Sequence, residues 1–197
     1  VVCQVLRHSG REEQAFLTSL AGLVLVLFWL VPYIYELFET MKNLFDIRGR
    51  VVVVTGGAGI LGRSICEYLA EQGAKVVVLD RDEQSGEALA ASIREKGGEA
   101  LFLVTDVLNR EVLVANREAI LAKYGQIDIL LNAAGGNMGG ATIAPDKSFL
   151  DLEIDAFKKV VDLNLFGTVL PTTVFGEAMT ARKKGVIVNF CSESALR

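Results

Sequence analysis

The sequence has one histidine, His8, and three cysteines that form no Cys-x-x-Cys pair. Zinc centres and histidine-based acid–base catalysis draw on those residue types, so neither is expected, and no metal site is predicted. The cysteine usage fits a reducing compartment and indicates a cytoplasmic protein. Lysine and arginine total 20 against 24 acidic residues, a formal charge of −4, and no basic run stands out. The composition therefore argues against a nucleic-acid partner.

Charge is also missing from one long stretch, between Ala15 and Tyr35. As a helix this stretch would span about 31 Å at ~1.5 Å per residue, close to the thickness of a bilayer core. Trp29, Tyr33 and Tyr35 lie toward one end of it, as an interfacial aromatic belt would. Three interpretations of residues 1–40 stay open: a membrane anchor over residues 15–35, a signal peptide, or an extension that is not part of the working protein. The signal peptide fits worst, because the run is long and no small-x-small cleavage site lies between its end and Glu36.

After residue 41 the pattern changes to short apolar runs that alternate with helical segments. The run of four valines at 51–54 predicts a strand buried on both faces, which is typical of a parallel sheet. Further strands are expected at 75–80, 100–105, 127–131 and 186–190. Helices are expected at 60–72, 83–96, 109–124 and 152–182, the last with a kink at Pro171. This alternation predicts one α/β domain over residues 41–197, a doubly wound parallel sheet of the Rossmann type.

A glycine-rich turn, Thr55-Gly56-Gly57-Ala58-Gly59-Ile60-Leu61-Gly62, separates the first strand from the first helix. Small residues let the backbone approach a diphosphate, and the helix directs free N–H groups and its positive dipole end at that group. A plain tight turn would need one or two glycines and not four. The position of this turn between a strand and a helix therefore favours a dinucleotide-binding site.

Asp80 ends the second predicted strand, 18 residues beyond Gly62. A carboxylate at this position can accept hydrogen bonds from both ribose hydroxyls of NAD and repels a 2′-phosphate. The following Arg81 could accommodate that phosphate, so NAD is the expected cofactor and NADP the alternative. An acidic residue at a strand end can also be a helix cap, but the spacing from the glycine turn favours the role of ribose ligand for Asp80.

These motifs, in this order, resemble the short-chain dehydrogenase/reductase family over about residues 45–197. Thr55, Gly56 and Gly62 resemble its cofactor turn, and Asn164 and Ser192 fall where the family has its active-site asparagine and catalytic serine. The resemblance implies that Asn164 and Ser192 are catalytic. It implies a dinucleotide held by Thr55, Gly56, Gly59, Ile60, Leu61, Gly62, Asp80, Arg81, Asp106, Val107, Asn132, Ala133, Ala134 and Gly135.

The sequence departs from the family pattern in two places. Ile60 stands where the family commonly has its middle glycine, and Gly59 takes that role one residue earlier, a spacing shared with the epimerase-like branch. No Tyr-x-x-x-Lys pair occurs; in the family it lies just downstream of the serine strand, and the chain ends five residues after Ser192. The chain is therefore expected to be truncated, to bind a dinucleotide weakly and to be inactive by itself. The segment from Met41 resembles a family start, which favours an upstream extension for residues 1–40.

The substrate is suggested by the loop from Ala134 to Asn137, continuing to Ala141 and Thr142. It resembles the D-mannonate oxidoreductases, also called fructuronate reductases, although the glycines could simply make a flexible loop. The expected reaction of the complete protein is hydride transfer between NAD(H) and a secondary alcohol or ketone, with a sugar acid as substrate. A nucleotide-sugar epimerase and a non-catalytic membrane-tethered dinucleotide-binding module are the alternatives. The resemblance also implies a homo-oligomer of the complete protein, paired through long helices.

Overall fold

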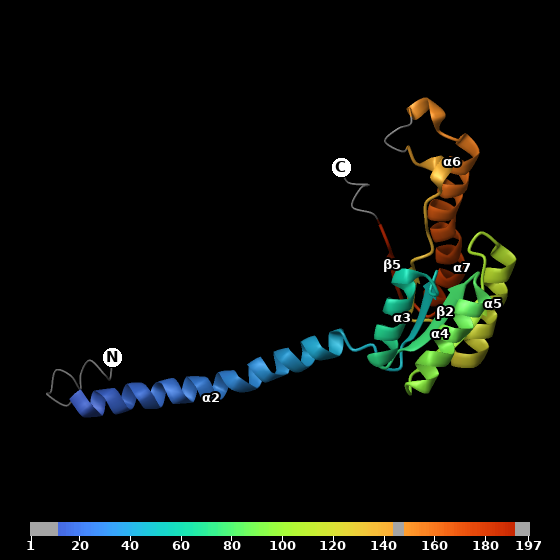
Figure 1. The fold of residues 1–197 in the computed structure, drawn as a ribbon. Helices are drawn as coiled ribbons and strands as arrows, with labels where there is room; N and C mark the ends of the chain where they lie inside the picture. Colours follow the sequence, from blue (N-terminus) through green and yellow to red (C-terminus); the bar gives the residue numbers. More distant parts are fainter. Residues whose placement is uncertain (1–11, 144–147, 192–197) are drawn as a thin grey trace. The chain divides into compact units, whose positions relative to one another are not determined.

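The computed structural model describes residues 12–143 and 148–191, and it divides the chain into two units after Asp46. The first unit contains one long helix, α2 (Glu12–Leu44), with Pro32 inside it. Within α2, residues Glu13–Met41 are long and apolar enough to cross a membrane by length and composition. The second unit holds all the strands and the remaining helices, and the two are described separately below (Figure 1).

The second unit is built on a parallel sheet in which the chain starts at the centre and works outward in both directions. The order is β3-β2-β1-β4-β5, so the topology reverses between β1 and β4. The strands are β1 (Val51–Thr55), β2 (Lys75–Asp80), β3 (Glu99–Val104), β4 (Ile129–Asn132) and β5 (Val186–Asn189). The five strands expected from the sequence are thus confirmed, with ends shifted by up to two residues.

Two helical layers cover the sheet, and alternate residues of the central strands point to opposite layers. Val52 and Val54 of β1 face α3 (Ile60–Glu71) and α4 (Glu83–Glu95), which contribute Cys66 and Leu89 to that core. Val51 and Val53 face the other core, which is completed by α5 (Arg110–Tyr124) and α7 (Gly167–Ala181). All four valines are fully buried, as expected for a strand covered on both sides. The doubly wound prediction is therefore confirmed (Figure 1).

The last helical stretch differs from the expected single helix over residues 152–182. Two short 3₁₀ turns, η1 (Gly139–Ala141) and η2 (Phe149–Asp151), precede it, and its first helix is α6 (Ile154–Val161). A π-helical turn, η3 (Asp162–Phe166), then separates α6 from α7, while Pro171 lies buried inside α7 without ending it. The kink expected at Pro171 stays a prediction, and the interruption that the structure shows is the π-helical turn before α7. Apolar residues continue through η3, so periodicity alone gives no sign of the wider turn, a feature often found at functional sites.

Candidate functional site

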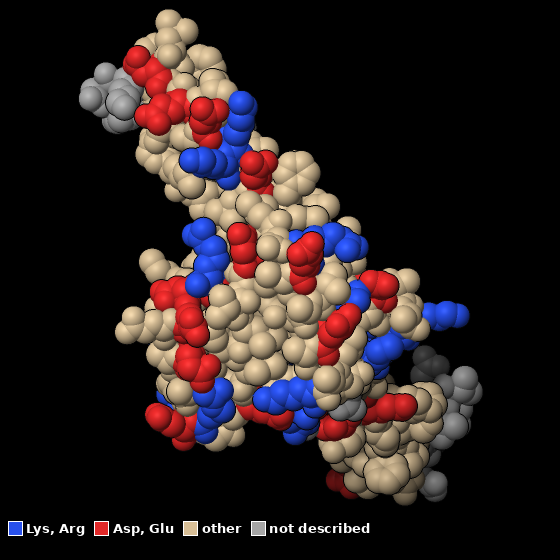
Figure 2. All heavy atoms as spheres, turned by 90° about the vertical axis from the view of Figure 1, so that its right-hand side faces the viewer, with Lys and Arg blue, Asp and Glu red and all other residues tan. Residues whose placement is uncertain are grey.

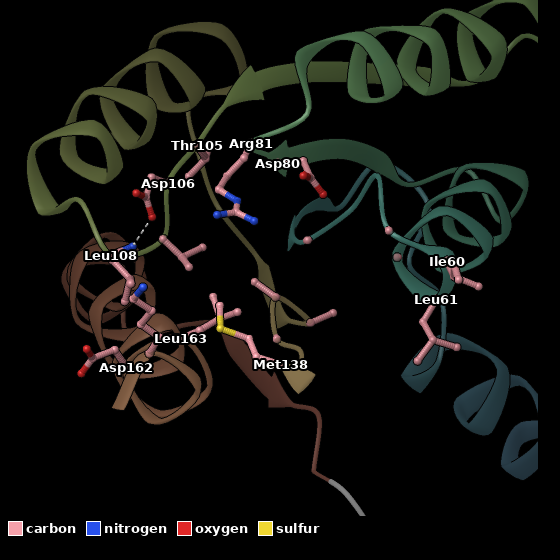
Figure 3. Close-up of a pocket in the computed structure, with 18 residues that line it drawn as sticks. Ile60, Leu61, Asp80, Arg81, Thr105, Asp106, Leu108, Met138, Asp162 and Leu163 are labelled. Atoms are coloured by element: carbon pink, nitrogen blue, oxygen red, sulfur yellow. Dashed lines mark hydrogen bonds between the residues drawn. The ribbon is translucent and has the colours of Figure 1, made fainter. Parts of the chain in front are cut away.

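A cavity of about 550 Å³ lies at the carboxyl ends of β1, β2, β3 and β4, at the reversal of the strand order. Open α/β sheets bind their ligands at this position. Among the residues predicted for the site, the following line the cavity: Gly56, Gly59, Ile60, Leu61, Gly62, Asp80, Arg81, Asp106, Val107, Ala133, Ala134 and Gly135. Figure 3 shows Ile60 and Leu61 on one side of this cavity, Asp106 and Leu108 across from them, and Asp80 and Arg81 between the two.

The glycine turn brings backbone so close to backbone that side chains have no room. Gly56 has φ +65°, and a Cβ placed there would lie 2.8 Å from the Cα of Ala134. A Cβ on Gly62 would lie 2.1 Å from the carbonyl oxygen of Gly56. Both glycines are therefore required for helix α3 to begin directly on the turn, and this leaves the N-terminus of α3 facing the cavity.

The N-terminus of α3 differs from those of its neighbours in having no capping side chain. Asp82 caps α4 by accepting from the amide of Ser85 at 3.0 Å, and Asn109 caps α5 by accepting from two backbone amides. Helix α3 begins after Gly59 with no side-chain cap and no acidic residue in its first turn. Its first N–H groups, which have no acceptor within the helix, therefore remain available to an anion in the cavity.

Asp80 is fixed beside the turn by backbone amides. One carboxylate oxygen accepts from the amide of Ala58 at 3.0 Å, and the other accepts from the amide of Asp82 at 3.1 Å. This arrangement ties the end of β2 to the glycine turn. Each oxygen retains a second lone pair for a hydroxyl group in the cavity.

The wall at the end of β3 is held by a residue that the sequence analysis did not identify. The Nδ2 of Asn116, on α5, donates to Thr105 Oγ1 at 2.8 Å and to the carbonyl oxygen of Val104 at 3.1 Å. Asp106 then turns the chain by accepting from the amide of Leu108 at 2.9 Å, the dashed line in Figure 3. Asn116 therefore positions the segment that carries Asp106 and Val107, two of the residues predicted to bind the dinucleotide.

Two residues predicted to bind the cofactor, Thr55 and Asn132, do not line the cavity, and their part in binding it remains a prediction. Thr55 is fully buried, and its Oγ1 accepts from the amides of Ala133 and Ala134, each at 3.1 Å. Asn132 is 2% exposed, and its Nδ2 donates to Thr172 Oγ1 at 2.9 Å and to Asn189 Oδ1 at 2.8 Å. Thr55 therefore holds the end of β4 to β1, and Asn132 holds β4 to α7 and β5.

Of the two residues predicted to be catalytic, Asn164 lies in the part of the chain that the structure describes and Ser192 does not. Asn164, in η3, does not line the cavity, and both N–H groups of its amide are engaged, with the carbonyl oxygens of Gly136 and Val160, each at 2.8 Å. Its Oδ1 accepts from the amide of Gly136 at 3.1 Å. In this structure Asn164 therefore fixes the loop after β4, and its catalytic part remains a prediction. Ser192 lies outside the described residues.

Six further cavity residues were missed: Thr105, Leu108, Met138, Lys159, Asp162 and Leu163. Thr105 and Leu108 flank the predicted pair Asp106-Val107, so their place in the chain was a usable signal. The other four come from the loop after β4 and from α6 and η3, and only tertiary packing brings them to the cavity (Figure 3). Among the residues that the structure describes, no group of three acidic, histidine or cysteine side chains could hold a metal ion.

Cys66 lies under the glycine turn and is fully buried. Its Sγ is 3.9 Å from the carbonyl oxygen of Gly57, and burial raises the pKa of the thiol from its ordinary 9.0 to about 12, with smaller contributions from the charges of Glu67 and Asp80. The thiol is therefore protonated at neutral pH and acts as a small packing residue.

A doubly wound parallel sheet, with a glycine turn and an uncapped helix at its reversal point, defines a nucleotide-binding α/β unit of the Rossmann type. Residues 50–197 match the family model of the short chain dehydrogenases. The chain belongs to that family. Residues 1–44 match a separate model, that of the stage III sporulation protein AC/AD protein family.

Relatives with curated names agree with the family. The chain is 34% identical to the uncharacterized oxidoreductase UxuB of Bacillus subtilis, over 76% of this chain and 57% of that protein. It is 33% identical to D-threitol dehydrogenase of Mycolicibacterium smegmatis, over 77% of this chain and 56% of the relative. The chain thus spans a little more than half the length of these relatives.

Solved structures of short-chain oxidoreductases and sugar alcohol dehydrogenases are also similar to this chain. The NAD+-bound xylitol dehydrogenase has 31% identity and a TM-score of 0.70, covering 77% of this chain and 56% of that one. A provisionally assigned D-mannonate oxidoreductase from Haemophilus influenza, with bound NAD, has 29% identity and a TM-score of 0.71, covering 77% and 57%. A metagenomic short-chain oxidoreductase in complex with NADP has 31% identity and a TM-score of 0.64, covering 75% and 64%.

Proposed function

We propose that this chain is the cofactor-binding part of an NAD-dependent oxidoreductase that interconverts a secondary alcohol and a ketone. The observation that carries the proposal is the uncapped N-terminus of α3, which shares one cavity with Asp80, while α4 and α5 are capped by their own side chains. An anion at that helix end and a hydroxylated sugar beside the carboxylate together describe a dinucleotide. The cavity volume of about 550 Å³ is suited to a bound small molecule or cofactor.

The residues present fit this cofactor. The first amides of α3, at Ile60, Leu61 and Gly62, would hold the diphosphate, and the close backbone packing at Gly56 gives it access. Asp80 would accept hydrogen bonds from the ribose hydroxyls, and Asp106-Val107 would contact the adenine. When bound, the nicotinamide supplies the hydride chemistry, and the protein supplies position and the surrounding charge. Arg81, exposed at the same rim, keeps NADP as the alternative.

For the substrate we propose a polyhydroxylated acid of the D-mannonate type. The resemblance of the loop after β4 supports this, as does the Haemophilus structure provisionally assigned to D-mannonate oxidoreductase. The D-threitol and xylitol dehydrogenases among the relatives make an uncharged polyol the second candidate. Assays of the complete protein with matched pairs of sugar acids and polyols distinguish the two, because only the acid requires recognition of a carboxylate.

We further propose that the complete protein associates with a second copy through α6 and the turn η3. Ile154, Phe157 and Leu165 are 58%, 46% and 52% exposed on these elements, so they form an unburied apolar strip. Exposed apolar strips of this kind commonly mark protein interfaces. Light scattering of the complete protein should give at least a dimer, and a strictly monomeric mass would contradict this part of the proposal.

Calorimetric titration of the chain with NADH and NADPH tests cofactor binding. We expect NADH to bind, and Asp80→Ala to weaken NADH by about tenfold or more, equivalent to ~1.4 kcal/mol, while NADPH is affected less. Glu95→Gln removes the same charge from an exposed site outside the cavity and should leave both affinities unchanged. Absence of heat with either dinucleotide, from protein whose cooperative melting shows it to be folded, would contradict the proposal.

A further inference from the structure

Helix α2 exposes apolar side chains on all of its sides. The nine consecutive residues from Leu23 to Val31 are between 42% and 81% exposed, and only 6% of the apolar window is buried. A helix that packs against one partner keeps a polar face for solvent, whereas one that is apolar all round is buried on every side. Helix α2 therefore requires surroundings that are apolar in every direction.

The length of the apolar part matches a lipid bilayer. Residues Glu13–Met41 form the candidate span, and the uncharged part from Ala15 to Tyr35 is about 31 Å long at ~1.5 Å per residue. The hydrocarbon core of a bilayer is ~30 Å thick. Glu12 and Glu13 precede the uncharged part and Glu36 and Glu39 follow it, so acidic groups lie just outside both ends.

The polar groups inside the uncharged run are satisfied within the helix. Thr18 Oγ1 donates to the carbonyl oxygen of Gln14 at 2.7 Å, and Ser19 Oγ donates to that of Ala15 at 3.0 Å. Such internal bonds are needed in lipid, where water cannot supply a partner. Toward the other end, the rings of Trp29 and Tyr33 pack at 5.0 Å between centroids, with amphipathic edges suited to the headgroup region.

We infer that α2 spans a lipid bilayer and anchors the dinucleotide-binding unit to a membrane. A second copy of the chain is a poorer occupant, because a paired helix would leave the apolar residues of its outer face in water. The helix is also separate from the dinucleotide-binding unit, since the two belong to different compact units and match different family models. The inference therefore stands apart from the proposed cofactor and substrate.

The test is extraction of the full chain from membranes with alkaline carbonate, followed by flotation with phosphatidylcholine and phosphatidylglycerol vesicles. The wild-type chain should remain with the membrane and float. Leu25→Lys with Phe28→Lys, which places two charges in the middle of the run, should reduce the floating fraction by about tenfold. Leu44→Lys with Phe45→Lys adds the same charges beyond the run, at residues 75% and 80% exposed, and should float like the wild type.

A second measurement on the wild-type chain covers the case in which the charged variant fails to fold. Trypsin added outside sealed vesicles should cut each inserted chain on one side of the run only, at Arg11 or at Lys42, and leave the peptide that contains the run in the vesicles. Release of the wild-type chain by carbonate, or recovery of that peptide in the supernatant, would overturn the inference. A mature chain that begins after Tyr35 would overturn it as well.

Discussion

Gly62→Ala adds one methyl group at the closest backbone approach in the glycine turn. The new Cβ would lie 2.1 Å from the carbonyl oxygen of Gly56 and 2.7 Å from the Cα of Gly57. Ordinary van der Waals contact begins near 3.4 Å, so the turn and the start of α3 must separate by more than an ångström. Because both neighbours are backbone atoms, no side-chain rotation can relieve this contact, and the first amides of α3 shift away from the anion.

The expected cost has two parts. Overpacking of this kind destabilises by roughly 1–3 kcal/mol, which lowers the melting temperature by about 2–4 °C per kcal/mol in a chain of this size. Displacement of the diphosphate-binding amides should reduce NADH affinity by about tenfold or more, ~1.4 kcal/mol, at temperatures where the variant is still folded. Calorimetry at about 15 °C together with thermal melts separates the two effects.

Gly139→Ala is the matched control, since a Cβ there meets nothing within 4 Å and Gly139 does not line the cavity. It should leave both affinity and melting temperature unchanged. If Gly62→Ala instead binds NADH with wild-type affinity, the diphosphate does not sit on this turn and the reasoning is refuted.

Three further outcomes follow from named contacts. Asn116→Ala removes both bonds to the Val104–Thr105 segment and should cost ~1–3 kcal/mol of stability and several-fold in NADH affinity; calorimetry showing equal affinity would contradict its positioning role. Asn164→Ala should speed hydrogen exchange at the amide of Gly136 by about tenfold while β1 amides are unaffected. Unchanged exchange at Gly136 would contradict the role of Asn164 in fixing the loop after β4. Burial raises the pKa of the Cys66 thiol from 9.0 to about 12, so between these pH values the folded state holds a proton that the unfolded state releases. The free energy of unfolding should therefore fall from pH 9 toward 12, by up to ~1.4 kcal/mol per pH unit. Cys66→Ala should flatten that slope in denaturant titrations.

The sheet could be predicted because each strand carries its own signal. Four consecutive valines can be buried only in a sheet covered on both faces, and the structure buries all of them. The glycine turn could also be predicted, since glycines at positions 56 and 62 indicate a close approach of backbone to backbone. The place of Asp80 beside the cavity could be predicted from its spacing along the sequence to that turn.

What could not be read from the sequence depends on packing between distant segments. Thr55 and Asn132 belong to the right motif, but whether a strand-end side chain faces the cavity or the neighbouring strand is decided by the register of β1 and β4. Asn116 reaches the cavity wall from another helix, and nothing in its local sequence marks it. The π-helical turn around Asn164 has the same apolar pattern as an ordinary helix, so its position appears only in three dimensions.

The most direct test of the account is hydrogen exchange of the full chain with and without NADH, followed by mass spectrometry. Bound cofactor should slow exchange in peptides covering residues 56–62 and 105–108, where the amides of the glycine turn and the end of β3 face the cavity. A second cavity of about 280 Å³ between the ends of α3 and α4, lined by Glu67, Lys96 and Gly98, serves as the internal control and should show no change. No protection at residues 56–62 with about 1 mM NADH, or protection confined to the second cavity, would contradict the assignment of the dinucleotide to the glycine turn.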